Sequence, residues 1–294
     1  MSRTVRRWLL VLALAGLVAL LVDTVPGTTP AHQAEYLRAS DLRLRAVRAG
    51  EGEPTLLLLH GYGESLLAWQ PMFDRLARRT HVIAVDLPGF GLSDKPPTGY
   101  SLDHMTDRLA DFLDRWTRGP VIVVGHSLGG EIAAALALRR PDRISGLVLL
   151  SPAGAGLTPA ADSVQKAADV MGWLHVASGI LLLPIHDPAW LGESDSALAY
   201  EPTTEAAYRT AAAAVLREFD FAALQDSFPR IRQPVLLLWG RQDPTVPFTT
   251  GERIAAALPS VTFVPLEHTL HRPHQSVPDR VAAEIEQWMA RLPS

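Results

Sequence analysis

Short, continuous apolar runs recur along this sequence, and segments of helical periodicity separate them. Thr55–Leu59, Val121–Val124 and Val235–Trp239 are such runs, whereas Leu102–Trp116 has the spacing of an amphipathic helix. A strand that is apolar on both faces needs helices on both sides, as in a parallel sheet. The alternation therefore predicts an α/β fold, with a mostly parallel sheet covered on both sides.

The remaining pattern predicts how the chain is divided. Further strands are expected at 42–47, 81–85, 144–150 and 261–264, and further helices at 66–79, 131–140 and 277–291. Between these, Ala153 to Arg230 is mostly helical, alanine-rich and punctuated by proline. We therefore expect a core of residues 31–152 and 231–294, with residues 153–230 inserted as a helical lid after the sixth strand. A length of 294 residues suits one large domain with an insertion.

The N-terminus has the pattern of a membrane signal. Arg3, Arg6 and Arg7 precede an apolar run from Trp8 to Val22, which is shorter than the about 20 residues of a full transmembrane helix. Residues 1–30 are therefore predicted to be a signal anchor, or a signal peptide, followed by a linker. Both alternatives stay open, because Thr29-Pro30-Ala31 is a poor cleavage site. The arginines favour a catalytic domain outside the cytoplasm, either membrane-anchored or exported.

Composition excludes several classes of protein. Cysteine is absent, so disulfides, zinc-thiolate sites and a cysteine nucleophile are impossible. The formal net charge is −4, and no basic stripe follows the first ten residues, which argues against a nucleic-acid partner.

The strongest chemical signal is a glycine-rich turn around one serine. Gly125-His126-Ser127-Leu128-Gly129-Gly130 follows the apolar run Val121–Val124 and opens a predicted helix. Such a strand-to-helix turn lifts the serine above the sheet edge, where it can act as a nucleophile. The backbone N–H of Leu128, at the helix N-terminus, is placed to stabilise an oxyanion.

On these residues the sequence resembles the α/β-hydrolase superfamily, from about Leu37 to the C-terminus. His60-Gly61-Tyr62-Gly63 is similar to the family's HGxG loop. The resemblance implies an eight-stranded sheet and a second oxyanion donor, the N–H of Tyr62, with Gly61 as the alternative. Asp86 to Ser93 is similar to the family's D-x-P-G-x-G-x-S loop, which implies a structural role. His60 is expected to brace its loop.

The resemblance also implies the partners of the serine. In this superfamily the order along the chain is Ser, then acid, then His. The segment Gly240 to Pro247 looks like the family's acid loop, with Asp243 as the acid. His271-Arg272-Pro273-His274 is similar to the family's H-x-P-H segment, which makes His271 the base and His268 the alternative. Leu270 and Ser276 depart from the family's usual Gly and Glu.

The histidines at 268, 271 and 274 raise a competing hypothesis of a zinc site. Pro273 interrupts helical spacing, and no carboxylate or cysteine stands near them in sequence to complete a ligand set. We therefore predict no metal and no cofactor.

Together these features predict a serine hydrolase that cleaves an ester or related acyl bond through an acyl-enzyme. The apolar lid favours a small-molecule acyl substrate with an apolar group. Within the resemblance, a C–C bond hydrolase, a cofactor-free haloperoxidase or perhydrolase, and an acyl transferase remain alternatives. A non-catalytic binding protein on the same fold is a further alternative.

Overall fold

The computed structural model describes residues 32–155, 190 and 206–292. The predicted membrane segment and most of the predicted lid lie outside these residues, so both stay predictions. In the part of the chain that is described, no helix has the length and hydropathy needed to cross a bilayer.

Within the described ranges, the strands form one eight-stranded sheet in the order β1-β2-β4-β3-β5-β6-β7-β8. β2 pairs antiparallel with β1 and β4, and every other pairing is parallel. The predicted mostly parallel sheet is confirmed. The strands are β1 (Glu35–Ala39), β2 (Leu42–Ala49), β3 (Thr55–Leu59), β4 (Val82–Val85), β5 (Val121–His126), β6 (Ile144–Leu150), β7 (Val235–Gly240) and β8 (Val261–Leu266).

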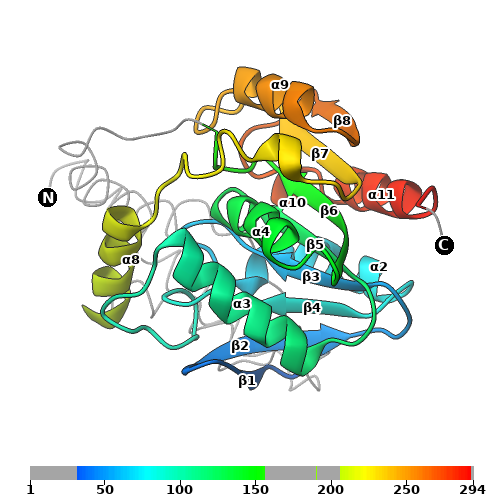
Figure 1. Cartoon of the computed structure of the whole chain (residues 1–294). Helices are drawn as coiled ribbons and strands as arrows, with labels where there is room; N and C mark the ends of the chain where they lie inside the picture. The colour runs from blue at the N-terminus through cyan, green and yellow to red at the C-terminus, as the bar shows by residue number, and fades with distance from the viewer. Residues whose placement is uncertain (1–31, 156–189, 191–205, 293–294) are drawn as a thin grey trace, which may run out of the picture.

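Helices cover both faces of this sheet (Figure 1). One face carries α3 (Leu102–Trp116), α4 (Leu128–Arg139) and α9 (Phe248–Ala257); the other carries α2 (Gln70–Ala77) and α11 (Pro278–Met289). In β3, Leu57 and Leu59 face the first group, and Leu56 and Leu58 face the second. This two-sided burial explains the continuous apolar runs of the sequence.

Some elements differ from the sequence-based prediction. β1 was not predicted, and α9 was not predicted either. The helix expected at 66–79 begins as a 3-10 turn, Leu66–Trp69, and becomes α-helical at Gln70, with a proline in its first turn. α4 begins at Leu128, three residues before the expected start. The last helix is divided into a short α10 (Pro273–Ser276) and α11.

Burial does not alternate along strand β2, because Arg45 and Val47 are buried as well as their apolar neighbours. Arg45 Nη1 lies 3.5 Å from Asp86 Oδ2, and the Arg45 N–H donates to Ser93 Oγ at 2.9 Å. Asp86 Oδ1 also accepts the Leu66 N–H at 2.7 Å. The loop after β4 thus takes part in a buried hydrogen-bond network. This agrees with the structural role that its resemblance to the family's D-x-P-G-x-G-x-S loop implies.

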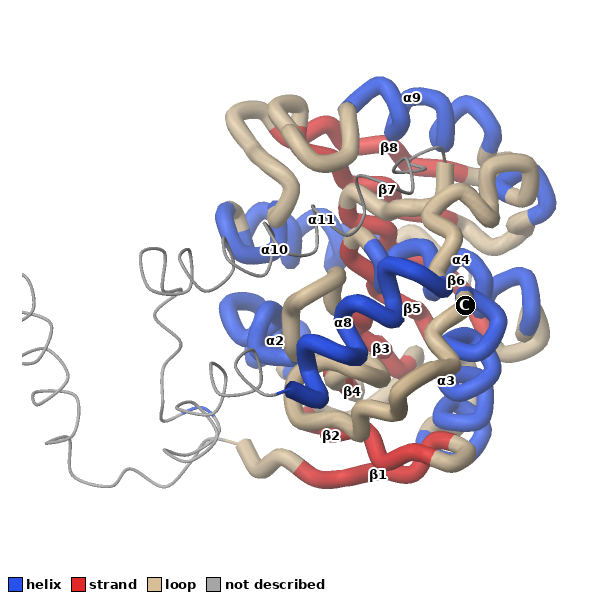
Figure 2. The backbone as a smooth tube through the Cα atoms, turned by 90° about the vertical axis from the view of Figure 1, so that its left-hand side faces the viewer, coloured by secondary structure: helices blue, strands red, loops and turns tan. Residues whose placement is uncertain are grey.

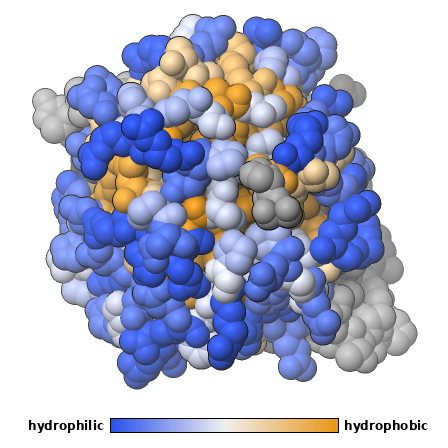
Figure 3. Space-filling model, turned by 45° about the vertical axis from the view of Figure 1, so that its right-hand side comes forward, coloured by the Kyte–Doolittle hydropathy of each residue, from blue (hydrophilic) through white to orange (hydrophobic). Residues whose placement is uncertain are grey.

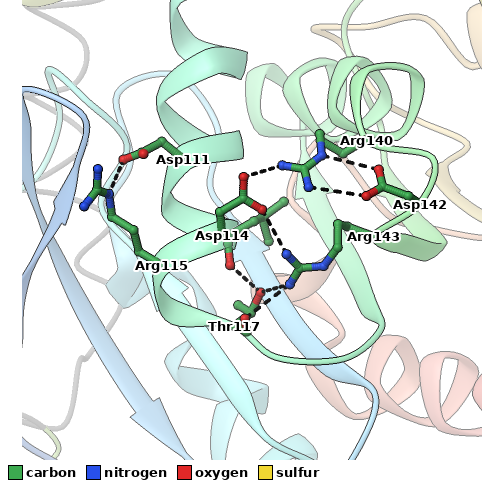
Figure 4. Close-up of polar contacts among 8 residues, drawn as sticks. Asp111, Asp114, Arg115, Thr117, Arg140, Asp142 and Arg143 are labelled. Carbon is green, nitrogen blue, oxygen red and sulfur yellow. Dashed lines mark hydrogen bonds and ion pairs between the residues drawn. The ribbon is translucent and has the colours of Figure 1, made fainter.

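Ion pairs join the surface ends of α3 and α4 (Figure 4). Arg140 Nη1 lies 2.5 Å from Asp114 Oδ2, and Arg143 Nη1 lies 2.9 Å from Asp114 Oδ1. Exposed pairs of this kind stabilise a fold only weakly, typically by about 0–1 kcal/mol each.

On the face drawn in Figure 3, hydrophilic side chains border the exposed apolar ones.

Helix α8 (Ala206–Glu218) lies across the ends of the central strands (Figures 1 and 2). Tyr62, in the loop after β3, donates its hydroxyl to Ala212 O at 3.2 Å, and Tyr208 packs edge-on against Phe90. The Gly154 N–H donates to Phe221 O at 2.9 Å. The described beginning and end of the predicted lid are therefore side by side.

Glu131 is a fully buried carboxyl group in the first turn of α4. Neither of its oxygens has a hydrogen-bond partner in the described structure. Burial raises the pKa of Glu131 to about 9, and the charge of Asp220 adds to this effect. The carboxyl group is therefore neutral at pH 7.

We expect Glu131→Gln to stabilise the protein at neutral and alkaline pH. Because the folded-state pKa lies above the model value of 4.5, the contribution of Glu131 to folding is intact below pH 4.5 and is lost as pH rises toward about 9. Glutamine cannot ionise, so the gain should grow from near zero at pH 4.5 to about 3 kcal/mol at pH 7. Urea denaturation across this pH range measures it. The exposed Glu252→Gln is the control, and a gain that does not increase with pH would contradict the prediction.

Candidate active site

Ser127 forms the turn between β5 and α4. Its φ of 50° and ψ of −115° lie in a region that non-glycine residues rarely adopt. Within residues 125–130 it alone is not buried, and its side chain does not cap α4. A Cβ on Gly125 would lie 2.3 Å from Gly129 O, and one on Gly129 would lie 2.3 Å from Leu59 O. Only glycine permits this close packing, so these two contacts explain why the predicted strand-to-helix turn needs glycine at both positions.

The carbonyl of Ser127 is held by three backbone donors. It accepts the N–H groups of Gly130, Glu131 and Ala153, at 3.0, 3.2 and 3.0 Å. In a trans peptide the C=O and the next N–H point in opposite directions. The N–H of Leu128 is thereby directed away from these donors, at the N-terminus of α4, where an anion is favoured.

His60 holds a second peptide in the same manner. The Leu87 N–H donates to His60 Nε2 at 2.9 Å, so the proton sits on Nδ1, which donates to Gly61 O at 2.8 Å. Burial lowers the pKa of His60 and keeps this ring neutral. The Gly61 carbonyl is fixed, and with it the opposite direction of the Tyr62 N–H. His60 braces the loop, as expected.

The remaining donor of this loop is already in use. The Gly61 N–H donates to Glu64 Oε2 at 2.8 Å, which removes Gly61 as an oxyanion donor. No described residue accepts a hydrogen bond from the N–H of Tyr62 or Leu128. These two groups are the available donors, in loops that meet where Gly129 packs on Leu59 and His60.

Asp243 and His271 come together from the loops after β7 and β8. His271 Nδ1 lies 2.8 Å from Asp243 Oδ2, and Asp243 Oδ1 accepts the N–H groups of Thr245 and Val246 at 2.8 and 2.9 Å. The Asp243 side chain is fully buried, whereas the His271 ring is 14% exposed. His268, the alternative base, is exposed with a φ of 54° and does not reach Asp243.

The surroundings set the charge of this pair. Burial tends to raise the pKa of Asp243, but the hydrogen bond from His271 and the two backbone N–H groups lower it below its usual range. Burial lowers the pKa of His271, and the charge of His126 adds to this, against the opposing effect of Asp243. A carboxylate thus faces Nδ1 of a largely neutral imidazole, which directs the proton to Nδ1 and leaves a lone pair on Nε2.

His126, the residue before Ser127, links the nucleophile turn to the base. Its Nε2 lies 2.8 Å from the backbone O of His271, and the two rings are 4.8 Å apart. Its Nδ1 lies 2.9 Å from Glu64 Oε2. Glu64, His126 and His274 are all buried, and their ligand-type atoms lie within 4.8 Å of one another, close enough to hold a metal ion. The guanidinium of Arg272 lies beside this group, with Nε 2.9 Å from Glu64 Oε1.

A profile of the Alpha/beta hydrolase family matches residues 56–284. The chain belongs to this family.

The relatives of this alpha/beta hydrolase include several hydrolytic enzymes, and this chain is a hydrolytic enzyme too. It is 31% identical over 268 residues to the pimeloyl-[acyl-carrier protein] methyl ester esterase of Aeromonas hydrophila, covering 82% of this chain and 97% of the relative. It is 27% identical over 255 residues to the (E)-2-((N-methylformamido)methylene)succinate hydrolase of Acinetobacter baylyi. This match covers 83% of this chain and 93% of the relative. A solved membrane phospholipase A matches with a TM-score of 0.77 and 26% identity, covering 99% of both chains.

The structure brings Asp243 and His271 into contact and joins His271 to the residue beside Ser127. The sequence analysis of this hydrolase missed Glu64 and the cluster around it. Glu64 directly follows the His60–Gly63 motif, and His126 lies within the serine motif, so both positions were in view. Only their spatial meeting, across 62 residues of sequence, shows that they act together.

We expect His60→Ala to destabilise the hydrolase by about 2–4 kcal/mol. The change leaves a cavity and an unpaired, buried Leu87 N–H. Chemical denaturation measures the loss, with His268→Ala as an exposed histidine control. Equal stability of the two variants would show that His60 does not hold the loop.

Proposed function

We propose that this chain is a serine hydrolase that cleaves a carboxylic ester, with Ser127 as nucleophile, His271 as base and Asp243 as the group that orients the base. The observation that carries the proposal is the Asp243–His271 hydrogen bond, formed beside the strained Ser127 turn. It is the arrangement by which an otherwise weak hydroxyl nucleophile is activated.

In the proposed reaction, Ser127 Oγ attacks the ester carbonyl carbon as its proton passes to His271 Nε2. The carbonyl oxygen becomes an oxyanion, which the N–H groups of Tyr62 and Leu128 stabilise, each by about 3–4 kcal/mol. His271 then gives the proton to the leaving alcohol as the ester bond breaks. Water attacks the acyl-enzyme with the same base, which releases the acid and restores the Ser127 hydroxyl.

The relatives support an ester as substrate. The Aeromonas protein is named an esterase of a methyl ester, and the matched structure is titled a membrane phospholipase A. We further propose that the substrate carries an apolar acyl chain and that the predicted N-terminal segment places the enzyme at, or exports it across, a membrane. A connected aromatic group between the loop after β3 and α8 supports an apolar acyl chain. It consists of Tyr62, Phe90 and Tyr208.

The first test is Ser127→Ala. Turnover of short- and long-chain p-nitrophenyl esters should fall by at least about 10³-fold, because the nucleophile is lost, while the melting temperature stays within a few degrees. Wild type should react with a fluorophosphonate probe and the variant should not. His268→Ala is the control that should keep activity. Full turnover by Ser127→Ala would refute the proposed function.

The second test is the pH profile of kcat/KM. His271 must be neutral to accept the serine proton, and its pKa lies below 6.5 because of burial. Activity should therefore fall on acidification with a midpoint below pH 6.5. Asp243→Asn removes a charge that raises this pKa, so the midpoint should move lower still while the rate drops by about 10³–10⁴-fold. A wild-type midpoint at pH 7 or above would contradict this assignment.

A further inference from the structure

One carboxylate, that of Glu64, contacts groups from three separate parts of the site. Its Oε2 accepts the Gly61 N–H at 2.8 Å and lies 2.9 Å from His126 Nδ1. Its Oε1 lies 2.9 Å from Arg272 Nε. The Glu64 side chain is only 4% exposed. Each contact neighbours a residue of the proposed mechanism: Gly61 precedes Tyr62, His126 precedes Ser127, and Arg272 follows His271.

The hydrogen bonds of His126 make it a bridge. Nε2 faces the carbonyl oxygen of His271 at 2.8 Å, and Nδ1 faces the carboxylate of Glu64. Both partners can only accept, so each contact is a hydrogen bond when the facing ring nitrogen carries a hydrogen. The attraction of His126 and Arg272 keeps the pKa of Glu64 well below its usual range despite burial, so an ionised carboxylate faces the ring.

The residues around these contacts are closely packed. A Cβ on Gly61 would lie 2.7 Å from His126 Nδ1 and 3.0 Å from Glu64 Oε2. On the other side, the buried His274 ring packs at a tilt between the rings of Trp69 and His126, with centroid distances of 4.6 and 4.5 Å. The Glu64–His126 pair is thus enclosed by backbone and aromatic rings, which fixes its geometry.

Resting on the proposed function, we propose that Glu64 is a positioning residue that joins the oxyanion loop, the nucleophile turn and the base loop through its contacts with Gly61, His126 and Arg272. Two of its contacts hold the loop after β8, which carries the proposed base. One acts through His126 on the His271 carbonyl, and the other acts directly on Arg272. The third fixes the peptide that leads into the Tyr62 donor. Displacement of any of these groups by about 1 Å would cost up to about 10²-fold in rate.

Glu64, His126 and His274 also have the spacing of a metal site. The Arg272 guanidinium at 2.9 Å favours the ion-pair interpretation, because it supplies the positive charge that a metal ion would bring. Elemental analysis of the purified enzyme decides between them. A transition metal at one equivalent per chain would overturn the positioning proposal; a metal content below a tenth of an equivalent supports it.

The main test compares Glu64→Gln, Arg272→Met and the double variant by steady-state kinetics, with active sites titrated by a fluorophosphonate. The 47% exposed side chain of Arg272 lets Arg272→Met fold even where a change at Glu64 does not. The matched control is Arg280→Met, an exposed arginine paired with Glu284 on α11.

We expect Glu64→Gln to lower kcat per titrated site by about 10–100-fold with KM changed less than about threefold. Arg272→Met should lower kcat by about 3–10-fold, and the double variant should be no slower than Glu64→Gln, because both act through one carboxylate. Arg280→Met should match wild type.

The proposal is overturned where Arg272→Met matches Arg280→Met in kcat, or where Glu64→Gln keeps the wild-type kcat per titrated site. Additive effects in the double variant would also overturn it. A wild-type enzyme that the fluorophosphonate does not label would instead refute the proposed function, so the two failures are distinct.

Discussion

The site depends on a backbone conformation that Ser127 would not adopt alone. A positive φ at a non-glycine residue costs on the order of 1–3 kcal/mol, and the surrounding contacts must maintain it. Three N–H groups grip the Ser127 carbonyl, two from α4 and one from the loop after β6. Glycines at 125 and 129 let the strand, the helix and the neighbouring loop close around it. The sheet and α4 thus act as the frame that keeps this turn strained.

The same contacts prepare the site for negative charge. Because peptides are planar, fixing the carbonyls of Ser127 and Gly61 also fixes the N–H groups of Leu128 and Tyr62. Donors set in place before the reaction need no reorganisation when charge develops, which is the main source of electrostatic catalysis. Both donors are held by groups that do not touch substrate in the proposed mechanism. The geometry of the oxyanion site therefore depends on these supporting groups as much as on the donors.

The sequence predicted what is encoded locally. The apolar runs predicted the parallel strands, and the resemblance to the family implied Asp243 and His271, whose side chains are in contact. It failed where meaning depends on distant partners. From the sequence, Arg45 is expected to be exposed. It is buried because Asp86, 41 residues away in sequence, lies beside it. In sequence Glu64 is only a loop residue, because its partners lie far along the chain, His126 at the end of β5 and Arg272 after β8. β1 is short and half-exposed, so its periodicity is weak.

The charges of the site suit the proton transfer that we propose. At rest, the Glu64 carboxylate lies beside both His126 and Arg272, and the Asp243 carboxylate lies beside the largely neutral His271 ring. When His271 takes the serine proton, the new cation lies 2.8 Å from the Asp243 carboxylate, and Glu64 also favours it. The electrostatic effect of His126 disfavours it. The carboxylates thus assist the charged intermediate, while burial and His126 keep the resting base neutral and ready to accept the proton.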